Sequence, residues 1–235
     1  MNKTIYLPDT NLLFNLAESV VLEKKYFEHW HWNSVNFWKR YGKQTQIPSL
    51  VWAEFCGLWF HKNVDLENYE LWFRNRLSVF SQIYQLIKRY KVDMCDESDI
   101  LFQSVLEIAS EITSQKMPEN LIKTISKRIN QTILSIENSI KKKGINKKNK
   151  EALERNKKNL LTGKILDGLD SVIVTFAYEF AKKKPETDIV VVSDDKFMVE
   201  TINYFYDAME NFSNYDVPEN VYAYTTSELV RKRQR

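Results

Sequence analysis

Four carboxylates stand in four separate stretches of the chain, and they are the side chains best suited to chemistry. They are Asp9, Glu54, Asp170 and Asp195. Asp9 follows the short apolar run 5–7, and Asp195 follows the β-branched run 189–192. Such runs are typical of buried parallel strands, and ligands of open α/β sheets bind at the carboxyl ends of those strands. We therefore expect the acids to meet in one cleft and to form a divalent metal site.

The chemistry of such a site is phosphodiester hydrolysis. Mg²⁺ and Mn²⁺ prefer carboxylate and water oxygens, neutralise transition-state charge and lower the pKa of an attacking water. Without a cation the clustered acids repel one another, so at least one pKa should be raised and metal binding should stabilise the fold. The simpler alternative is four solvated helix caps, but capping does not explain Glu54, which lies in the second turn of its helix.

Two of the acids have an acidic neighbour that competes for the same role. In segment 167–170 the two acids lie three residues apart and share one helix face. We assign the ligand role to Asp170, because it leads the face that would press on the sheet, and a position at the rim to Asp167. We prefer Asp195 over Asp194, because Asp194 lies one residue closer to the strand and would point away.

Five strand-like runs alternate with helical patterns along the chain. The runs cover residues 4–7, 45–47, 91–94, 189–193 and 221–224. This alternation predicts a parallel α/β sheet, because each right-handed crossover packs its helix back onto the sheet. We expect five parallel strands flanked by helices on both faces, in a single domain over residues 1–235.

A lysine-rich stretch at residues 116–163 interrupts this pattern, and we expect it to be an inserted helical hairpin. Residues 141–164 hold ten Lys or Arg against two Glu, although the net charge of the whole chain is only +3. A charge run of this kind is usually a solvated helix face, and contact with nucleic-acid phosphates is the alternative. The lysines that we expect to bind nucleic acid are Lys141, Lys142, Lys143, Lys147, Lys148, Lys157 and Lys158.

Composition narrows the class of protein further. With 235 residues and 43% hydrophobic content, the chain can bury a full core. No apolar run approaches the roughly 18 residues of a membrane span, and no signal-type segment precedes the first strand-like run, so we expect a cytoplasmic protein. The only cysteines, Cys56 and Cys95, are too few for a disulfide framework or a cysteine-rich zinc site.

The acids and their settings together resemble the PIN-domain nucleases. The resemblance rests on segment 9–11 (Asp-Thr-Asn) after the first strand, a Glu in the helix after Pro48, an Asp ahead of Val174, and segment 192–197. It covers residues 4–60 and 165–197, and the middle only by its helix pattern. It implies a five-stranded parallel sheet in the order 3-2-1-4-5, a Mg or Mn site and cleavage of single-stranded RNA.

The resemblance also implies roles for individual residues. Asp9, Glu54, Asp170 and Asp195 match the acidic positions of the family. Asn11 and Ser193 match its polar positions, which help to hold water and metal. The chain departs from the family in the long gap between the second and third acids, which the lysine-rich insertion fills. It also has Pro8 before the first acid, and a proline is tolerated there only at the very end of the strand.

The sequence thus predicts a metal-dependent endoribonuclease, in which a water activated by the ion attacks phosphorus without a covalent enzyme intermediate. Similarity to the toxin branch implies an antitoxin or other regulatory protein, a role in defence, and a homodimer. Two other classes stay open, a nuclease directed at DNA and a nucleic-acid-binding or scaffold protein without cleavage activity. A haloacid-dehalogenase phosphatase is disfavoured, because Asn11 stands where that family needs a second Asp.

Overall fold

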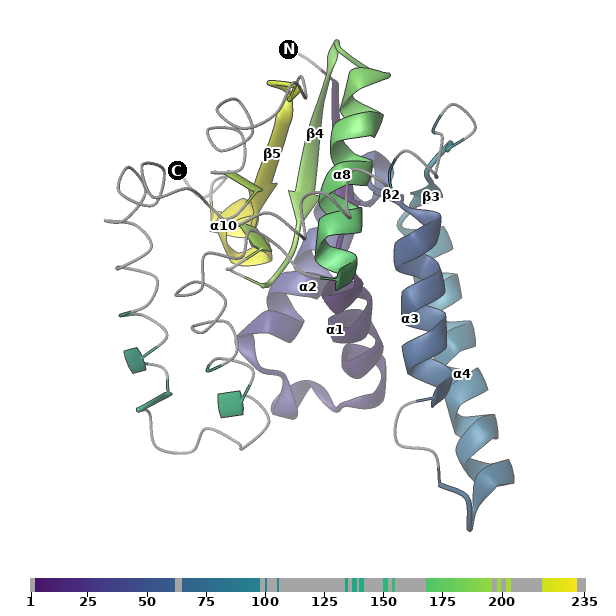
Figure 1. Cartoon of the computed structure of the whole chain (residues 1–235). Helices are drawn as coiled ribbons and strands as arrows, with labels where there is room; N and C mark the ends of the chain where they lie inside the picture. Colours follow the sequence, from purple (N-terminus) through teal and green to yellow (C-terminus); the bar gives the residue numbers. More distant parts are fainter. Residues whose placement is uncertain are drawn as a thin grey trace.

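The computed structural model describes most of the chain outside the predicted insertion (Figure 1). The described residues are 3–61, 65–97, 100, 105, 134, 137–138, 140–141, 150–151, 154, 168–195, 198–199, 202–203 and 217–231. Within the predicted insertion most positions, and therefore the hairpin itself, lie outside the described residues.

The centre of the fold is a parallel sheet of three strands in the order β1-β4-β5. Its strands are β1 (Lys3–Pro8), β4 (Thr187–Val192) and β5 (Val221–Tyr224). The last four residues of β4, from Ile189, are all buried, as expected for a central strand covered on both faces. The mixed α/β class with a parallel sheet is therefore as predicted.

The prediction of one continuous five-stranded sheet is wrong. All five predicted strands form, but β2 (Gln46–Ile47) and β3 (Asp93–Met94) pair with each other in a separate parallel sheet. Both strands have only two residues. Pro48 ends β2 at once, because it has no N–H to donate, and both residues of β3 are exposed, so that extending the pairing would bury little.

The two sheets meet at a single point. An isolated parallel bridge joins Tyr6 of β1 to Thr45, which directly precedes β2. Followed through this bridge, the neighbouring strands lie in the order β3, β2, β1, β4, β5. One bridge in place of a ladder leaves β2 and β3 as a separate two-stranded sheet beside β1.

The register of β1 on β4 brings two strand ends together. Leu7 lies opposite Val191 and Pro8 opposite Val192, the last residues of their strands. The Asp9 N–H then donates to the Val192 carbonyl oxygen at 2.8 Å. Pro8 thus stands at the very end of β1, the one position at which we expected a proline to be tolerated.

Helices surround both sheets. They are α1 (Thr10–Val21), α2 (His29–Tyr41), α3 (Ser49–His61), α4 (Tyr69–Arg89), α8 (Gly168–Lys182) and α10 (Thr226–Arg231), with 3-10 turns at Lys24–Tyr26 and Gly42–Gln44. α8 packs on β4 and β5, whereas α1 packs against α2, α3 and α4. In Figure 1, α3 and α4 lie side by side and extend well beyond the sheet.

The core gathers around the first two helices. Leu12, Leu13 and Leu16 of α1 are buried, and the fully buried Phe37 and Trp38 of α2 pack in the same cluster. None of the described helices is both long enough and apolar enough to cross a membrane. Cys56 and Cys95 are free thiols, as expected.

Candidate active site

Asp9 is the centre of the polar cluster at the carboxyl edge of the three-stranded sheet. It follows β1 directly, caps the amino terminus of α1, and is only 7% exposed. Its Oδ1 accepts a hydrogen bond from the backbone N–H of Thr10 at 2.6 Å. Its Oδ2 accepts one from Asn11 Nδ2 at 2.6 Å and one from Ser193 Oγ at 2.8 Å. Three donors therefore fix the carboxylate in one orientation.

Asn11 and Ser193 tie the ends of β1 and β4 together. Asn11 Nδ2 also donates to Ser193 Oγ at 3.0 Å, and its Oδ1 accepts from the backbone N–H of Asp194 at 3.3 Å. Ser193 Oγ in turn accepts from the backbone N–H of Asp195 at 3.0 Å. Both polar residues thus contact the first acid and also set the path of the segment that carries the last one.

Glu54 reaches this cluster through Thr10. The Thr10 side chain is buried, and its Oγ1 donates a short hydrogen bond to Glu54 Oε2 from α3. Sequence reasoning missed this role for Thr10. The sequence does place a hydroxyl directly after the acid at the end of the first strand. At the start of a helix, however, such a hydroxyl is equally well explained by helix capping. The contact joins α3 to the edge of the sheet and fixes one oxygen of Glu54.

The electrostatics of Asp9 reflect both its burial and its acidic neighbours. Burial is the largest effect and, against the hydrogen bonds from Ser193 and Thr10, raises the pKa of Asp9 to about 6. The negative charges of Glu54 and Asp195 raise it further. The expected direction of the pKa shift is therefore present, although desolvation contributes more to it than like-charge repulsion. Glu54 and Asp195, two of the other three predicted acids, therefore lie within electrostatic range of Asp9.

Asp194 is held by partners other than Asp9. Its Oδ2 accepts from Asn15 Nδ2 of α1 at 2.9 Å, and its Oδ1 accepts from Thr226 Oγ1 at 2.5 Å and Thr226 N–H at 3.2 Å. Burial raises the pKa of Asp194, and these hydrogen bonds lower it. The Asp194 carboxylate links the start of α10 to α1. Because Asp194 has this structural role, we keep Asp195 as the predicted metal ligand.

Asp170 lies in the first turn of α8 and is half-buried. The 15 residues of α8 make a helix of about 22 Å, and the six residues of β4 span about 20 Å. Because a short turn joins them and α8 packs back on β4, the start of α8 falls at the carboxyl edge of the sheet. That edge also holds Asp9. Asp167 lies outside the described residues.

The donor chemistry of this cluster fits a hard divalent cation, because its acids offer only carboxylate oxygens. The acids lie near one another but do not form a tight cage. Among the residues that the structure describes, no three His, Cys, Asp or Glu side chains form a group that could enclose an ion. The buried, negatively charged Asp9 is the best anchor for a cation in this cluster, since a cation would offset its desolvation.

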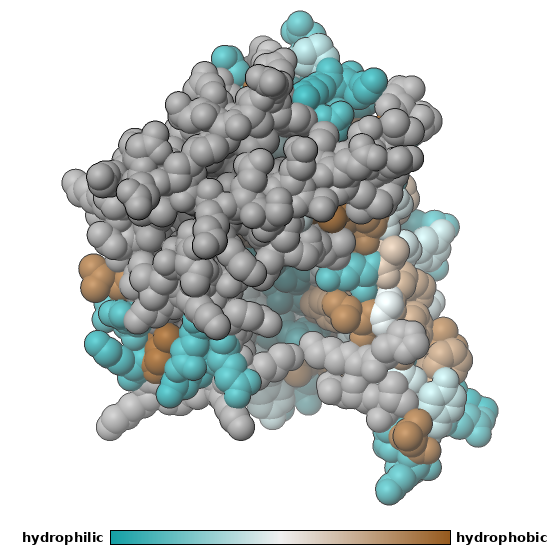
Figure 2. All heavy atoms as spheres, in the orientation of Figure 1, coloured by the Kyte–Doolittle hydropathy of each residue, from teal (hydrophilic) through white to brown (hydrophobic). Residues whose placement is uncertain are grey.

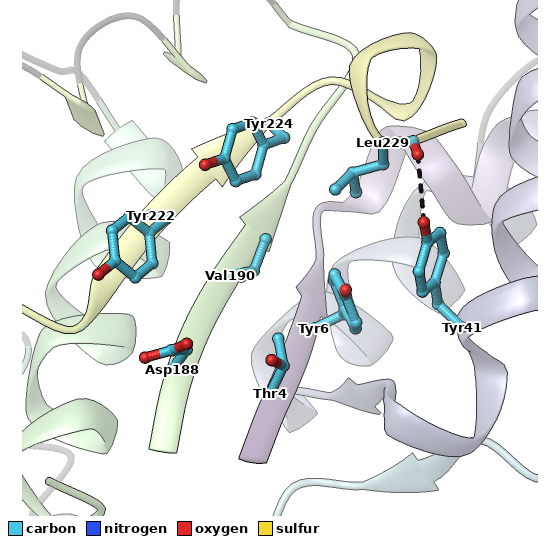
Figure 3. A pocket seen from close by; sticks show the side chains of 8 residues that line it. All are labelled: Thr4, Tyr6, Tyr41, Asp188, Val190, Tyr222, Tyr224 and Leu229. Carbon is cyan, nitrogen blue, oxygen red and sulfur yellow. Dashed lines mark hydrogen bonds between the residues drawn. The ribbon is translucent and has the colours of Figure 1, made fainter. Parts of the chain in front are cut away.

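A hollow of about 370 Å³ opens elsewhere, on one face of the three-stranded sheet (Figure 3). None of the predicted site residues lines it. Tyr222 and Tyr224 of β5 flank it on one side, and on the other Tyr41 Oη donates to the Leu229 carbonyl oxygen at 3.1 Å. Its walls carry one carboxylate, Asp188, so it does not compete with the strand ends as a metal site.

The lysines predicted to contact nucleic acid lie almost entirely beyond what the structure describes. Lys141 is exposed, and its backbone N–H donates to the Glu137 carbonyl oxygen at 3.1 Å. The other six, at positions 142, 143, 147, 148, 157 and 158, are outside the described residues. Phosphate contact by this stretch stays a prediction.

No protein-family model matches the chain, and neither the curated proteins nor the solved structures give a match.

Proposed function

We propose that this protein is a Mg²⁺- or Mn²⁺-dependent endoribonuclease of the PIN type. One observation carries the proposal, the fixed and buried carboxylate of Asp9 at the carboxyl edge of a parallel sheet, with Glu54 and Asp195 in electrostatic range. Burying an acid among other acids is costly to folding, and helix capping alone does not require Glu54 or Asp195 to be nearby. A cation that the acids share would relieve this cost.

Asp9, Glu54, Asp170 and Asp195 would hold the ion. When bound, a Mg or Mn ion would neutralise charge on the phosphate and lower the pKa of an attacking water. The protein's own groups pre-orient the ligands. Donors from segment 10–11 and Ser193 fix Asp9, the Thr10 hydroxyl fixes Glu54, and the Ser193 side chain fixes the backbone of Asp195.

Two features of the fold support the PIN assignment. The strand neighbours run β3, β2, β1, β4, β5 once the bridge between Tyr6 and Thr45 is followed, which is the order that the family would have. The polar positions of the family, Asn11 and Ser193, both hydrogen-bond Asp9. We propose RNA as the substrate on the family resemblance and on the lysine-rich stretch, which would neutralise phosphates.

Regulation by an antitoxin or a similar inhibitory protein, a role in defence and a cytoplasmic location belong to the same proposal. They follow from the resemblance to the toxin branch. A nuclease whose ligands are already oriented would need such restraint in the cell.

The test is cleavage of end-labelled single-stranded RNA by the purified full chain with Mn²⁺, Mg²⁺ or EDTA. We expect shortened products with either ion and none with EDTA. Asp195→Asn should abolish cleavage. Asp188→Asn is the matched control, because it changes an acid of the same sheet at the opposite end of β4, and it should cleave like the wild type.

Two other outcomes would each overturn the proposal. Retention of RNA without shortened product, equally in Mn²⁺ and EDTA, would identify a nucleic-acid-binding or scaffold protein. Cleavage of DNA but not of RNA under the same conditions would keep the metal site and replace the substrate.

A further inference from the structure

The hollow on one face of the three-stranded sheet is built by alternate residues of all three strands. Side chains of a strand point in turn to the two faces of a sheet, so every second residue reaches the same face. The strand residues that line the hollow are Thr4, Tyr6, Asp188, Val190, Tyr222 and Tyr224. Tyr41 of α2 and Leu229 of α10 complete the lining on the side of β1 (Figure 3). The sheet thus forms the floor of the hollow, and two helices form part of its wall.

The register of the strands sets a tyrosine on either side of a valine. Tyr6 of β1 lies opposite Val190 of β4, and Val190 lies opposite Tyr222 of β5. Neighbouring strands are about 4.8 Å apart, so the Cα atoms of the two tyrosines are separated by roughly 10 Å. Figure 3 shows Val190 between the two larger side chains. The small residue on the central strand therefore leaves a slot between two aromatic rings.

The wall of the slot on the side of β1 is held in place by other side chains. The ring centres of Tyr6 and Tyr41 are 4.7 Å apart, and the rings of Tyr6 and Phe37 meet edge to face at 6.0 Å. Tyr41 is only 5% exposed, and its Oη bonds the Leu229 carbonyl oxygen. Because these contacts order the wall before any ligand enters, binding does not have to order it. The opposite wall is more open, since Tyr222 is 41% exposed.

The hollow combines aromatic ring faces with one negative charge. Four of the eight residues that line it are tyrosines, and the face of a tyrosine ring attracts cations. Asp188 precedes Val190 by two residues on β4, which places it about 6.6 Å along the strand on the same face. Among the described residues that line the hollow, Asp188 is the one charged side chain. An organic cation would be attracted by both features, whereas Asp188 would repel a phosphate or a carboxylate.

The lining also indicates which kind of cation fits. A hard divalent metal ion needs several oxygen ligands, and the hollow offers a single carboxylate. A quaternary ammonium group differs from a metal ion in carrying its charge on methyl groups, which pack on ring faces. It also has no N–H that must find an acceptor. Cages of aromatic side chains are the usual sites for such groups.

The hollow differs in this respect from the exposed apolar surface of the molecule. Apolar side chains gather where α3 and α4 project (Figure 2), and Leu71 and Leu77 are among the exposed ones. A leucine has neither a charge nor a ring face. That surface therefore does not select a ligand by its charge, as the hollow does.

We propose that the hollow binds a small quaternary-ammonium compound, with the cationic head between Tyr6 and Tyr222 and beside Asp188. The part of the hollow toward Tyr224 and Leu229 would take the rest of the molecule. The ligand is a small molecule, because a volume of about 370 Å³ lies in the range of small-molecule sites. None of the predicted metal ligands lines the hollow, so the proposal stands independently of the nuclease.

The test is titration of the full chain with choline in phosphate buffer, by calorimetry and by the proton NMR signal of the choline methyl groups. We expect saturable binding with a Kd on the order of 1 mM, as suits so small a ligand. The methyl signal should move upfield, because protons over the face of an aromatic ring are shielded. The uncharged carbon analogue of choline has the same shape and should bind roughly tenfold more weakly or worse.

One pair of variants tests the charge. Asp188→Asn keeps the shape of the side chain and should weaken choline binding roughly fivefold. Glu186→Gln is the matched control, because Glu186 is an exposed acid two residues earlier that does not line the hollow, and it should bind choline like the wild type. Asp188→Asn stays a valid control for RNA cleavage, since choline is not part of that assay.

A second pair of variants tests the ring face. Tyr222→Leu removes the ring and should weaken choline binding roughly three- to fivefold, whereas Tyr222→Phe keeps the ring and should bind like the wild type. Tyr222 is exposed enough that both variants should fold, and circular dichroism of each variant checks this.

Several results would overturn the proposal. They are the absence of saturable choline binding, equal affinity for choline and its uncharged analogue, and equal effects of Asp188→Asn and Glu186→Gln. Equal losses in Tyr222→Leu and Tyr222→Phe would count against it as well, because the hydroxyl and not the ring face would then matter. Tighter binding of guanosine than of choline would identify a site for a nucleobase instead.

Discussion

The edge of the sheet around Asp9 and the projecting half of α4 depart in opposite ways from the usual burial of apolar side chains and exposure of charged ones. At the sheet edge a carboxylate is buried, and three donors from Thr10, Asn11 and Ser193 are turned toward it. On α4 several large apolar side chains, Leu71, Leu77 and Tyr84 among them, are exposed. Each arrangement is costly in the isolated chain. Under the proposed function, a cation would offset the cost at the sheet edge, whereas nothing in the cluster around Asp9 would offset the exposure on α4.

The largest expected effect is on catalysis at the sheet edge. Asp9→Asn should lower the rate of RNA cleavage by roughly 1000-fold, because a neutral amide no longer anchors a cation that contributes several kcal/mol to the transition state. The measurement is single-turnover cleavage in Mn²⁺, with circular dichroism to show an intact fold. Unchanged cleavage by purified Asp9→Asn would contradict the proposal that this edge of the sheet is the catalytic site.

The next effect is on stability against pH, again at the sheet edge. The pKa of Asp9 in the folded protein is about 6, above its ordinary value of 3.8. The folded state therefore binds this proton more tightly than the unfolded chain does. The stabilisation it gives is full below pH 3.8 and is lost as the pH rises through 6.

In EDTA, the free energy of unfolding of the wild type should fall across this window by about 3 kcal/mol more than that of Asp9→Asn. Denaturant titrations at a series of pH values measure this difference. Parallel curves for the two proteins would show that the pKa of Asp9 is not raised.

A smaller effect is expected from the residue that orients Glu54. Thr10→Val keeps the shape of the side chain and removes the hydroxyl that donates to Glu54. Because a hydrogen bond to a charged group contributes about 1.5–3 kcal/mol, kcat should fall roughly tenfold or more. KM should change little. Thr10→Ser keeps the donor and should recover most of the rate. Equal losses in both variants would point to packing instead of positioning.

The smallest effect is expected on α4. Leu77→Arg should change the free energy of unfolding by less than about 0.5 kcal/mol, because the side chain is exposed and contributes little to the core. Thermal and denaturant unfolding measure it. A loss of several kcal/mol would mean that Leu77 packs within the core, and the contrast between the two regions would disappear.

Local patterns were enough to predict the elements that carry the site. The apolar runs before Asp9 and Asp195 predicted β1 and β4, and parallel pairing then placed their ends together. Each of these features is encoded within a few neighbouring residues, which explains why the sequence alone predicts them.

Features set by long-range packing were not predicted. The Thr10 to Glu54 contact depends on how α3 lies against α1, and the capture of Asp194 by Asn15 and Thr226 depends on where α10 docks. The prediction of one five-stranded sheet was wrong for a related reason. The strand propensity at 45–47 and 91–94 was present, but Pro48 and the exposure of β3 limit the ladder to two residues.

The most direct test of the central claim is the position of a bound ion. Crystals of the protein soaked in Mn²⁺ should give an anomalous peak beside the carboxylate of Asp9, within coordination distance of its Oδ1 or Oδ2, and Asp9→Asn crystals should lack it. Peaks found only elsewhere on the molecule, or no peak with Mn²⁺ in excess, would contradict the claim that this edge of the sheet holds a metal ion.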